Sequence, residues 1–251
     1  MITINFVIPA YNEQKRLEKT FKALNSFRPS KDIKITKVIF INDGSTDSTL
    51  KILKNTKLKF SKKIISYSQN QGKGYAIKQG FLSANADYAL FFDTDMSTPI
   101  SELKKILPLL KQNIPVIIGT RKNGQSTVTT PQPIYRQILG RCFTYLSNII
   151  LNTWVTDFTC GFKAFSRQAY QSIAPLMTIN GWSFDSEILF LANKLNFKIQ
   201  EKALIWGNEA NTKVDLKKDI FISLIELFKI RINHSSPLTL PYLKLAQASV
   251  N

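Results

Sequence analysis

Short runs of apolar residues alternate with longer amphipathic segments along the first half of the chain. The runs are too short for helices and lack the alternating pattern of half-exposed strands, so they are typical of strands buried on both faces. The clearest are INFVIPA (4–10), KVIFIND (37–43) and DYALFFD (87–93). Between them, segment 12–27 places Leu17, Phe21 and Leu24 at helical spacing. This alternation predicts an α/β protein whose mostly parallel central sheet is covered by helices on both faces.

The rhythm of strands and helices continues to about residue 122 and then loosens. Its further members are KIISYSQN (63–70), GKGYAIKQGFLSANA (72–86), ISELKKILPLLKQ (100–112) and VIIGTR (116–121). Beyond Gly124 we predict a long helix over 135–151, an irregular middle and a C-terminal amphipathic helix. The predicted divisions are one domain (1–215) with two halves, about 1–122 and about 123–215, followed by a C-terminal helix and tail (216–251).

Polar motifs follow three of these strands, at the edge of a parallel sheet where ligands bind. They are Tyr11-Asn12-Glu13, Asn42-Asp43-Gly44-Ser45 and Asp93-Thr94-Asp95. In an extended segment Asp93 and Asp95 point to the same side, and two carboxylates so close repel each other unless a cation or a shared proton lies between them. A hard divalent ion, Mg²⁺ or Mn²⁺, prefers such oxygen ligands and also binds substrate phosphates. The motifs predict one site, although a lone D-x-D sequence is also compatible with a helix cap and a solvated turn.

The same aspartates are compatible with a second kind of enzyme. A hydrophobic strand that ends in D-x-D also introduces phosphatases of the haloacid dehalogenase type, in which the first aspartate is the nucleophile and the second is the acid or base. Those chains usually begin with this strand, whereas three strand and helix units precede Asp93 here. The position of the motif argues against a phosphatase.

The charge of the chain indicates an anionic partner. There are 34 Lys and Arg residues against 17 Asp and Glu residues, which gives a formal net charge of +17. Such a charge fits nucleic acid, anionic lipid or phosphate esters, and a lysine-rich solvated surface is the alternative explanation. Against a nucleic-acid-binding protein, the aromatic residues are not interleaved with the basic ones as they are in a stacking platform.

Few features of the sequence concern its location. Cys142 and Cys160 do not make a disulfide framework, and no signal peptide follows Met1. No stretch reaches the roughly 20 apolar residues of a membrane-spanning helix. We therefore expect a cytoplasmic, reduced protein that meets a membrane only from the side, as a peripheral protein at its cytoplasmic face.

The polar motifs belong to a longer ordered set. Its members are VIPAYNE (7–13), INDGSTDST (41–49), NQGKGYAIKQG (70–80), DTD (93–95), GTR (119–121), DFTCGFKAF (157–165) and GWSFDSEILFLA (181–192). In order and spacing this set resembles the family 2 glycosyltransferases with a GT-A fold, and among them the dolichyl-phosphate β-glucosyltransferases and their prokaryotic polyprenyl-phosphate relatives. The resemblance covers roughly residues 4–215. It implies that 1–215 is a catalytic domain with a nucleotide half (about 1–122) and an acceptor half (about 123–215).

That resemblance implies an inverting transferase of a hexose. Glucose from UDP-glucose is the first expectation for the donor, and a polyprenyl phosphate of the dolichyl type is the expected acceptor. A polyprenyl-phosphate mannosyltransferase that uses GDP-mannose and a non-catalytic relative of the family are the alternatives.

The resemblance also implies donor-binding roles for residues at the strand ends. Asp43 matches the carboxylate that binds uracil, while Asp93 and Asp95 match ligands of the Mg²⁺ or Mn²⁺ ion that holds the diphosphate. Lys73, and Lys213 in the segment NEANTKV, match basic residues near the donor phosphates. The implied donor-binding set is Pro9, Tyr11, Glu13, Asp43, Lys73, Asp93, Asp95 and Lys213.

The segment from Arg121 to Thr156 contains no acidic residue. Because guanidinium groups suit phosphate oxygens, we expect its arginines to bind the acceptor phosphate. The predicted acceptor-phosphate set is Arg121, Arg136 and Arg141. Under the resemblance, the phosphate attacks the anomeric carbon of the sugar, and Asp157 matches a family acid that organises the acceptor site. The implied catalytic residues are Asp95, Asp157 and Arg136.

The C-terminal helix DIFISLIELFKIRI (219–232) is too short to span a bilayer. Its polar stripe consists of Ser223, Glu226, Lys229 and Asn233, and its apolar face consists of Phe221, Leu224, Ile225, Phe228 and Ile232. One interpretation is a helix packed on the domain core. The other is an interfacial helix in the headgroup layer, with Lys217, Lys218 and Arg231 facing anionic lipid. Of the remaining residues that often carry chemistry, we expect His234 at the surface and Cys160 as a buried thiol.

Overall fold

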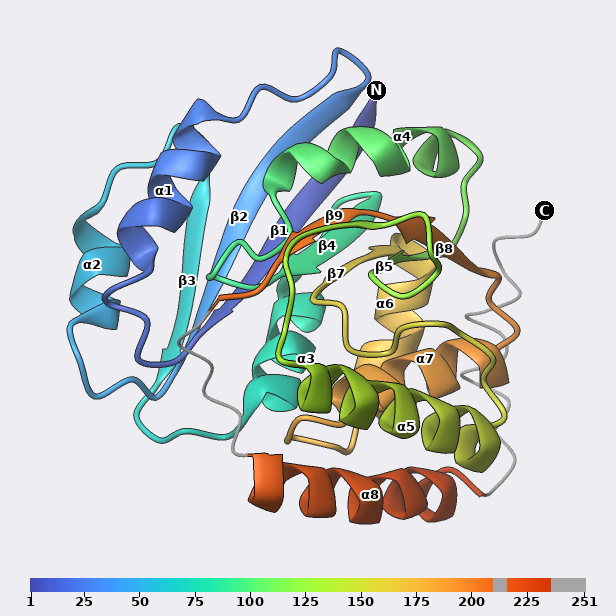
Figure 1. Cartoon of the computed structure of the whole chain (residues 1–251). Helices are drawn as coiled ribbons and strands as arrows, with labels where there is room; N and C mark the ends of the chain where they lie inside the picture. The colour runs from blue at the N-terminus through green and yellow to red at the C-terminus, as the bar shows by residue number, and fades with distance from the viewer. Residues whose placement is uncertain (210–215, 236–251) are drawn as a thin grey trace.

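A seven-stranded sheet forms the centre of the computed structural model, which describes residues 1–209 and 216–235 (Figure 1). Its strands are β1 (Ile2–Ala10), β2 (Ile33–Asp43), β3 (Lys62–Tyr67), β4 (Tyr88–Phe92), β5 (Val116–Thr120), β7 (Phe162–Ser166) and β8 (Ile199–Ala203). The order across the sheet is β3-β2-β1-β4-β7-β5-β8. Within it, β7 runs antiparallel to both of its neighbours, and the other neighbouring pairs are parallel. The predicted mostly parallel sheet is confirmed.

Helices cover both faces of the sheet because strand residues alternate between two apolar cores. Phe6 and Ile8 of β1 point into one core, and Val7 points into the other. The helices of the first core are α1 (Leu17–Ser26), α2 (Thr49–Asn55) and α4 (Leu103–Lys111), and those of the second are α3 (Lys73–Ser83), α6 (Arg167–Ile173) and α7 (Phe184–Lys194). Two short 3₁₀ helices, η1 (Ile100–Glu102) and η2 (Ala174–Leu176), adjoin α4 and α6.

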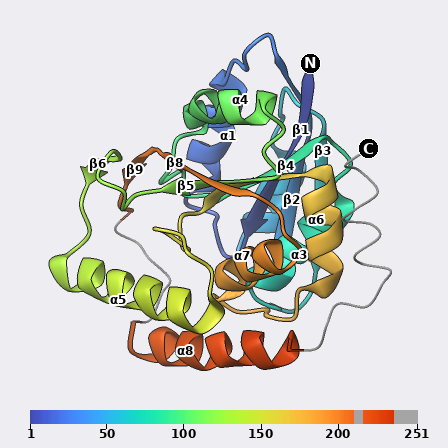
Figure 2. The ribbon, with the colours of Figure 1, turned by 90° about the vertical axis from the view of Figure 1, so that its right-hand side faces the viewer.

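Two long helices, α5 (Ile134–Leu151) and α8 (Leu216–Asn233), lie side by side at one end of the molecule (Figures 1 and 2). Leu151 at the end of α5, and Leu227 and Ile230 of α8, are buried in the second core. The C-terminal helix is therefore packed onto the domain, as the first interpretation of its sequence expects. In the part of the chain that the structure describes, neither these helices nor any other is long and apolar enough to cross a bilayer.

The prediction of an irregular middle after α5 is wrong. That region contains β7, α6, α7 and β8, and its last strand, β9 (Ile205–Gly207), pairs with β6 (Thr127–Thr130) in a second, two-stranded sheet. These elements are short, and charged residues interrupt the apolar runs by which buried strands are predicted. In β7 the fully buried Lys163 interrupts the apolar run, and β8 carries Glu201 and Lys202 in a strand of five residues. Strands from both predicted halves of the catalytic domain thus share one sheet.

Candidate active site

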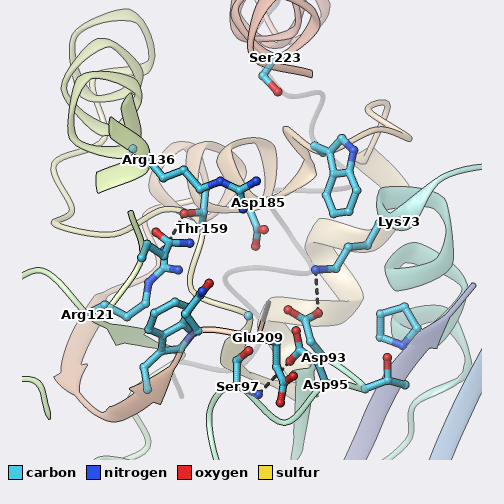
Figure 3. Close-up of a pocket in the computed structure, with 18 of the residues that line it drawn as sticks. Lys73, Asp93, Asp95, Ser97, Arg121, Arg136, Thr159, Asp185, Glu209 and Ser223 are labelled. Atoms are coloured by element: carbon cyan, nitrogen blue, oxygen red, sulfur yellow. Dashed lines mark hydrogen bonds and ion pairs between the residues drawn. The ribbon is translucent and has the colours of Figure 1, made fainter. Parts of the chain in front are cut away.

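A cavity of about 770 Å³ opens at the carboxyl ends of β1, β2 and β4 and extends to α5 and α8. Figure 3 shows Asp93 and Asp95 on one side of it and Arg121 and Arg136 on the other. The predicted site residues that line the cavity are Pro9, Tyr11, Glu13, Asp43, Lys73, Asp93, Asp95, Arg121, Arg136 and Arg141. The structure therefore brings an acidic and a basic group of side chains to one cavity. Lys213 lies outside the described residues.

The turn after β1 is tied to the turn after β2. Asn12 adopts a left-handed conformation, with φ of 50°, and its backbone N–H donates to the hydroxyl of Ser45 at 2.9 Å. In return, the N–H of Thr46 donates to the Asn12 side chain at 2.8 Å. The N–H of Glu13 donates to the hydroxyl of Thr49 at 2.7 Å. Because residues 11–16 form this turn, α1 begins at Leu17 and is shorter than the predicted helix over 12–27.

Asp43, at the end of β2, is buried and holds the loop that precedes α3. Its carboxylate accepts hydrogen bonds from the Asn70 side chain at 2.8 Å and from the backbone N–H groups of Gln71 at 2.8 Å and Gly72 at 3.1 Å. The next residue, Gly44, has φ of 65°, and a Cβ there would overlap the backbone of Gln69. The loop from Asn70 to Gly72 is thereby fixed beside the cavity.

The two aspartates after β4 lie in a turn. The prediction that they share one side of an extended segment is wrong, because the strand ends at Phe92 and the chain turns through Met96, which has φ of 55°. Asp95 accepts a hydrogen bond from the N–H of Ser97 at 2.8 Å. Burial raises the pKa of the Asp95 carboxyl, and the neighbouring charge of Asp93 raises it further. The turn still directs both side chains to the cavity.

Lys73 provides the cation beside these carboxylates. Its ammonium group lies 2.7 Å from a carboxylate oxygen of Asp93 (Figure 3). It also lies 5.6 Å from the ring centroids of both Trp182 and Phe184. Burial acts to lower the pKa of Lys73, but the Asp93 carboxylate outweighs it and leaves the pKa above its usual range. Lys73 is therefore a charged ammonium at the acidic end of the cavity.

At the basic end, a buried carboxylate fixes Arg121. Asp157 accepts hydrogen bonds from Nε of Arg121 at 2.7 Å and from Nη2 at 2.8 Å, and Nη2 also donates to Thr159 at 2.8 Å. Burial by itself would raise the pKa of Asp157, but the Arg121 guanidinium holds this pKa well below its usual range. Asp157 is fully buried and does not line the cavity, so its charge acts there through Arg121 and through Lys122, whose ammonium lies 3.7 Å from its carboxylate.

Helix α5 and the segment after β5 supply the remaining cations of this end. Arg136 reaches from α5 toward the cavity (Figure 3), and its Nε is buried without a hydrogen-bond partner among the described residues. Lys122, just after β5, donates to the carbonyl of Gly140 at 2.9 Å and to the hydroxyl of Thr144 at 2.7 Å. These bonds attach the basic segment to α5. Arg141 lines the cavity from the following turn of that helix.

This arrangement of motifs coincides with a known family. Residues 5–174 match the family model described as Glycosyl transferase family 2. The chain belongs to glycosyltransferase family 2. The predicted family is confirmed, and with it the prediction that the protein is a glycosyltransferase.

Curated relatives of this glycosyltransferase match most of its length. It is 33% identical over 254 residues to the dolichyl-phosphate beta-glucosyltransferase of Dictyostelium discoideum, across 92% of this chain and 77% of the relative. The enzyme of the same name from Saccharomyces cerevisiae is 33% identical over 252 residues, across 92% of this chain and 75% of the relative. The human enzyme is 28% identical over 224 residues, across 84% of this chain and 69% of the relative.

Solved structures share the fold at low sequence identity. Glucosyl-3-phosphoglycerate synthase from Mycobacterium tuberculosis, crystallised with Mn²⁺, UDP-glucose and glycerol 3-phosphate, has a TM-score of 0.66 at 18% identity and covers 94% of this chain and 81% of that one. Mannosyl-3-phosphoglycerate synthase from Rubrobacter xylanophilus has a TM-score of 0.68 at 16% identity and covers 96% and 78%. The predicted GT-A fold is confirmed.

The glycosyltransferase cavity also contains residues that sequence reasoning missed. Asp185 lines it and forms a buried ion pair with Lys163. Burial raises the pKa of Asp185, although Lys163 opposes the shift. An acidic residue inside the apolar segment GWSFDSEILFLA was the signal for it. Trp182 and Trp206 also line the cavity.

One surface prediction of the sequence is wrong and one buried-residue prediction is confirmed. His234 is buried, with Nε2 2.9 Å from Oε1 of Glu187, because the end of α8 turns back onto α7. Cys160 is fully buried, as expected, and burial raises the pKa of its thiol to about 11.

Proposed function

We propose that this glycosyltransferase moves glucose from UDP-glucose to a polyprenyl phosphate of the dolichyl type. The observation that carries the proposal is one cavity with carboxylates at the sheet end, guanidinium groups at the other end, and α5 and α8 at its edge. The names of the curated relatives support the sugar and the lipid acceptor. A solved structure of the same fold crystallised with Mn²⁺ and UDP-glucose supports the donor.

The acidic end suits a divalent metal ion. Asp93 and Asp95 offer hard oxygen ligands. Burial and the neighbouring charge of Asp93 raise the pKa of Asp95, so a cation bound there would favour its ionised form. Gly161 leaves room for this arrangement, because a Cβ there would overlap the Asp93 carboxylate. Mg²⁺ or Mn²⁺ bound there would neutralise charge on the leaving diphosphate. Across the described part of the chain, no group of three or more His, Cys, Asp or Glu side chains is placed to hold a metal, so donor phosphate oxygens would supply further ligands.

We assign the donor contacts to the turns after β1, β2 and β4. Asp43 and the loop that it holds line the space for the base, with Pro9, Tyr11 and Glu13 on the adjacent wall. Lys73 lies within reach of the diphosphate, on the same side as Asp93. Lys213 keeps its assignment to the donor phosphates as a prediction from the sequence.

The acceptor phosphate would bind between Arg121, Arg136 and Arg141. A lipid phosphate is ionised at neutral pH, so its oxygen is a nucleophile without a protein base. That oxygen forms a bond to the anomeric carbon as the bond from this carbon to the β-phosphate oxygen of UDP breaks. UDP leaves with the electron pair, and attack from the opposite face inverts the configuration. Arg136 stabilises the charge of the reacting phosphate, and Asp157 contributes by positioning Arg121.

The two long helices would bring the enzyme to its lipid. Their outer sides expose apolar residues that a protein surface in water rarely gathers in such number. This exposed apolar surface consists of Ile134, Tyr135, Ile138, Tyr145 and Ile149 on α5, and Phe221, Ile222, Ile225, Phe228 and Ile232 on α8. The cavity reaches Leu139 and Phe143 of α5 and Ile220 of α8, which gives the prenyl chain an apolar path from the phosphate to this surface. We propose peripheral attachment to a membrane through it, at the cytoplasmic face.

A panel of radiolabelled donors tests the assignment of sugar and nucleotide. The purified protein would be incubated with polyprenyl phosphate in vesicles, with Mg²⁺ or with EDTA, and label in the lipid phase would be counted. We expect transfer from UDP-glucose that EDTA abolishes. Transfer from GDP-mannose in preference to UDP-glucose would overturn the assignment and would indicate a mannosyltransferase.

A further inference from the structure

A short segment, Thr178–Ser183, lies between the lipid-facing helix and the donor site. We call it the connector. It precedes α7 and contacts α8 on one side and the start of α3 on the other. Backbone N–H and carbonyl groups of the connector make contacts on both sides.

On the α8 side, three side chains hydrogen-bond to the connector, and a fourth, His234, acts through one of them. Glu226 accepts a hydrogen bond from the N–H of Ser183 at 3.2 Å, and a Cβ on Gly181 would lie 2.6 Å from its carboxylate. Asn233 donates to the hydroxyl of Thr178 at 3.0 Å. His234 contacts Glu187, whose carboxylate accepts hydrogen bonds from the N–H groups of Thr178 at 2.8 Å and Ile179 at 2.9 Å. Both ends of the connector are thus attached to α8.

On the donor side, the connector packs against two glycines. The N–H of Gly74 donates to the carbonyl of Asn180 at 2.8 Å. A Cβ on Gly72 would overlap that same carbonyl group, and a Cβ on Gly74 would overlap the carbonyl of Ile179. Between these glycines stands Lys73, whose ammonium contacts Asp93 and lies near the connector residue Trp182. Gly72 in turn donates to Asp43.

The outer side of α8 is exposed and apolar, and it does not hold the connector. Phe221 and Phe228 are 66% and 58% exposed and contact none of the connector residues through a hydrogen bond or ring contact that the structure describes. One face of the helix is therefore available to a lipid surface, while the other face is tied to the loop that positions Lys73.

We propose that α8 and the connector couple a lipid surface to the donor site, so that binding of the outer face of α8 to a bilayer raises the affinity for the nucleotide-sugar donor. This inference rests on the proposed membrane attachment and deepens it. Seating α8 on lipid fixes the connector, and the connector fixes Gly72–Gly74 with Lys73 in the position that binds the donor diphosphate. By thermodynamic linkage, the donor must raise the affinity for the lipid surface by the same factor.

Equilibrium dialysis of radiolabelled UDP-glucose with Mg²⁺ measures the coupling. It would be run with and without vesicles of phosphatidylcholine and phosphatidylglycerol that contain no polyprenyl phosphate, so that no transfer occurs. We expect vesicles to strengthen UDP-glucose binding about fivefold or more. Sedimentation of the protein with the same vesicles should show that UDP-glucose strengthens vesicle binding by an equal factor.

Two matched variants of α8 separate its faces. Glu226→Ala/Asn233→Ala removes contacts of the inner face, and we expect it to sediment with vesicles as the wild type does while its UDP-glucose affinity no longer responds to them. Glu226→Gln, which keeps an acceptor oxygen for Ser183, should retain most of the response. Phe221→Ser/Phe228→Ser changes only the outer face, and it should weaken vesicle binding while keeping the wild-type affinity for UDP-glucose in solution.

The outcomes distinguish this inference from the proposed membrane attachment. A wild-type protein that sediments with vesicles but binds UDP-glucose equally well with and without them overturns the coupling alone. The coupling is also overturned if vesicles strengthen UDP-glucose binding as much in the folded Glu226→Ala/Asn233→Ala variant as in the wild type. The contacts between α8 and the connector would then not be needed for the effect. A wild-type protein that never sediments with vesicles overturns the attachment and the coupling together. Circular dichroism of each variant checks that it is folded.

Discussion

The acidic and basic ends of the cavity are built in different ways. At the acidic end, side chains come from turns directly after β1, β2 and β4, and Asp43 accepts hydrogen bonds from Asn70, Gln71 and Gly72 of the adjacent loop. At the basic end, the cations come from α5 and the segment after β5, and Arg121 depends on a fully buried partner, Asp157. Backbone turns hold the first group, whereas side-chain pairs and helix packing hold the second.

This difference predicts how substitutions at the two ends affect activity and stability. A turn held by several hydrogen bonds keeps its shape when one partly buried carboxylate becomes an amide, so substitutions there alter chemistry before stability. A guanidinium held by a buried carboxylate does not survive the loss of its partner, because the remaining charge is left without compensation. The predictions below test this contrast, and the largest effect comes first.

Asp95→Asn should lower transfer about 10³-fold and leave the melting temperature near that of the wild type. It removes one formal charge from the proposed metal ligands at almost constant volume, while the turn keeps its other hydrogen bonds. Steady-state kinetics over a range of Mg²⁺ concentrations, with a thermal melt of the same sample, measures both quantities. Near-normal turnover at low Mg²⁺ would show that Asp95 is not a metal ligand.

Asp157→Asn should act on stability instead, with a loss of about 3–5 kcal/mol in the free energy of unfolding. It leaves the partly buried Arg121 guanidinium without its counter-charge. The double variant Asp157→Asn/Arg121→Met should recover part of that loss, because it removes the uncompensated charge as well. Urea unfolding at pH 7 measures both, and an Asp157→Asn variant as stable as the wild type would contradict the contrast.

The ion pair between Asp157 and Arg121 predicts how the free energy of unfolding depends on pH. The folded pKa of Asp157 lies below its unfolded value, so its contribution to stability is fully present above about pH 5 and is lost as the pH falls through the lower, folded pKa. Between pH 7 and pH 3.5 the wild type should therefore lose more unfolding free energy than Asp157→Asn does. Equal losses in the two proteins would contradict the depressed pKa.

Phe221→Ser/Phe228→Ser should weaken vesicle binding about 30-fold, because two half-inserted phenyl rings contribute about 2 kcal/mol together. Sedimentation with anionic vesicles measures this, and higher salt should weaken the remaining binding. The matched control is Leu224→Ser, which changes a half-buried residue packed on the core and should lower stability. Vesicle binding that is unchanged in the double variant would move the lipid contact elsewhere on the protein.

Arg136→Gln should raise the KM for polyprenyl phosphate about tenfold and leave the affinity for UDP-glucose unchanged. The change removes a charge-assisted hydrogen bond to the acceptor phosphate, while the donor turns lie at the other end of the cavity. Lys104→Gln, an exposed residue of α4, controls for the loss of one positive charge from the surface. A change confined to the KM for UDP-glucose would place Arg136 on the donor.

Sequence reasoning located the acidic end more fully than its surroundings. Uninterrupted apolar runs identify buried strands, and polar residues directly after them must meet at one edge of a parallel sheet, so Asp43, Asp93 and Asp95 followed from local pattern. The fold of the region after α5 did not follow, because Lys163 is buried only with its distant partner Asp185. The C-terminal helix was ambiguous for a similar reason. Its apolar face divides between the core and solvent, and only the packed structure separates Leu227 from Phe228.

Transfer to an acceptor with and without its phosphate tests the central claim most directly, namely that one cavity joins a nucleotide-sugar to a lipid phosphate. The wild-type protein would be incubated with radiolabelled UDP-glucose, Mg²⁺ and vesicles that contain either polyprenyl phosphate or the corresponding polyprenol, and the lipid product would be identified by mass spectrometry. We predict a polyprenyl phosphate that carries one glucose, and no product from the polyprenol. Equal transfer to the polyprenol, or label in neither lipid, would contradict the account.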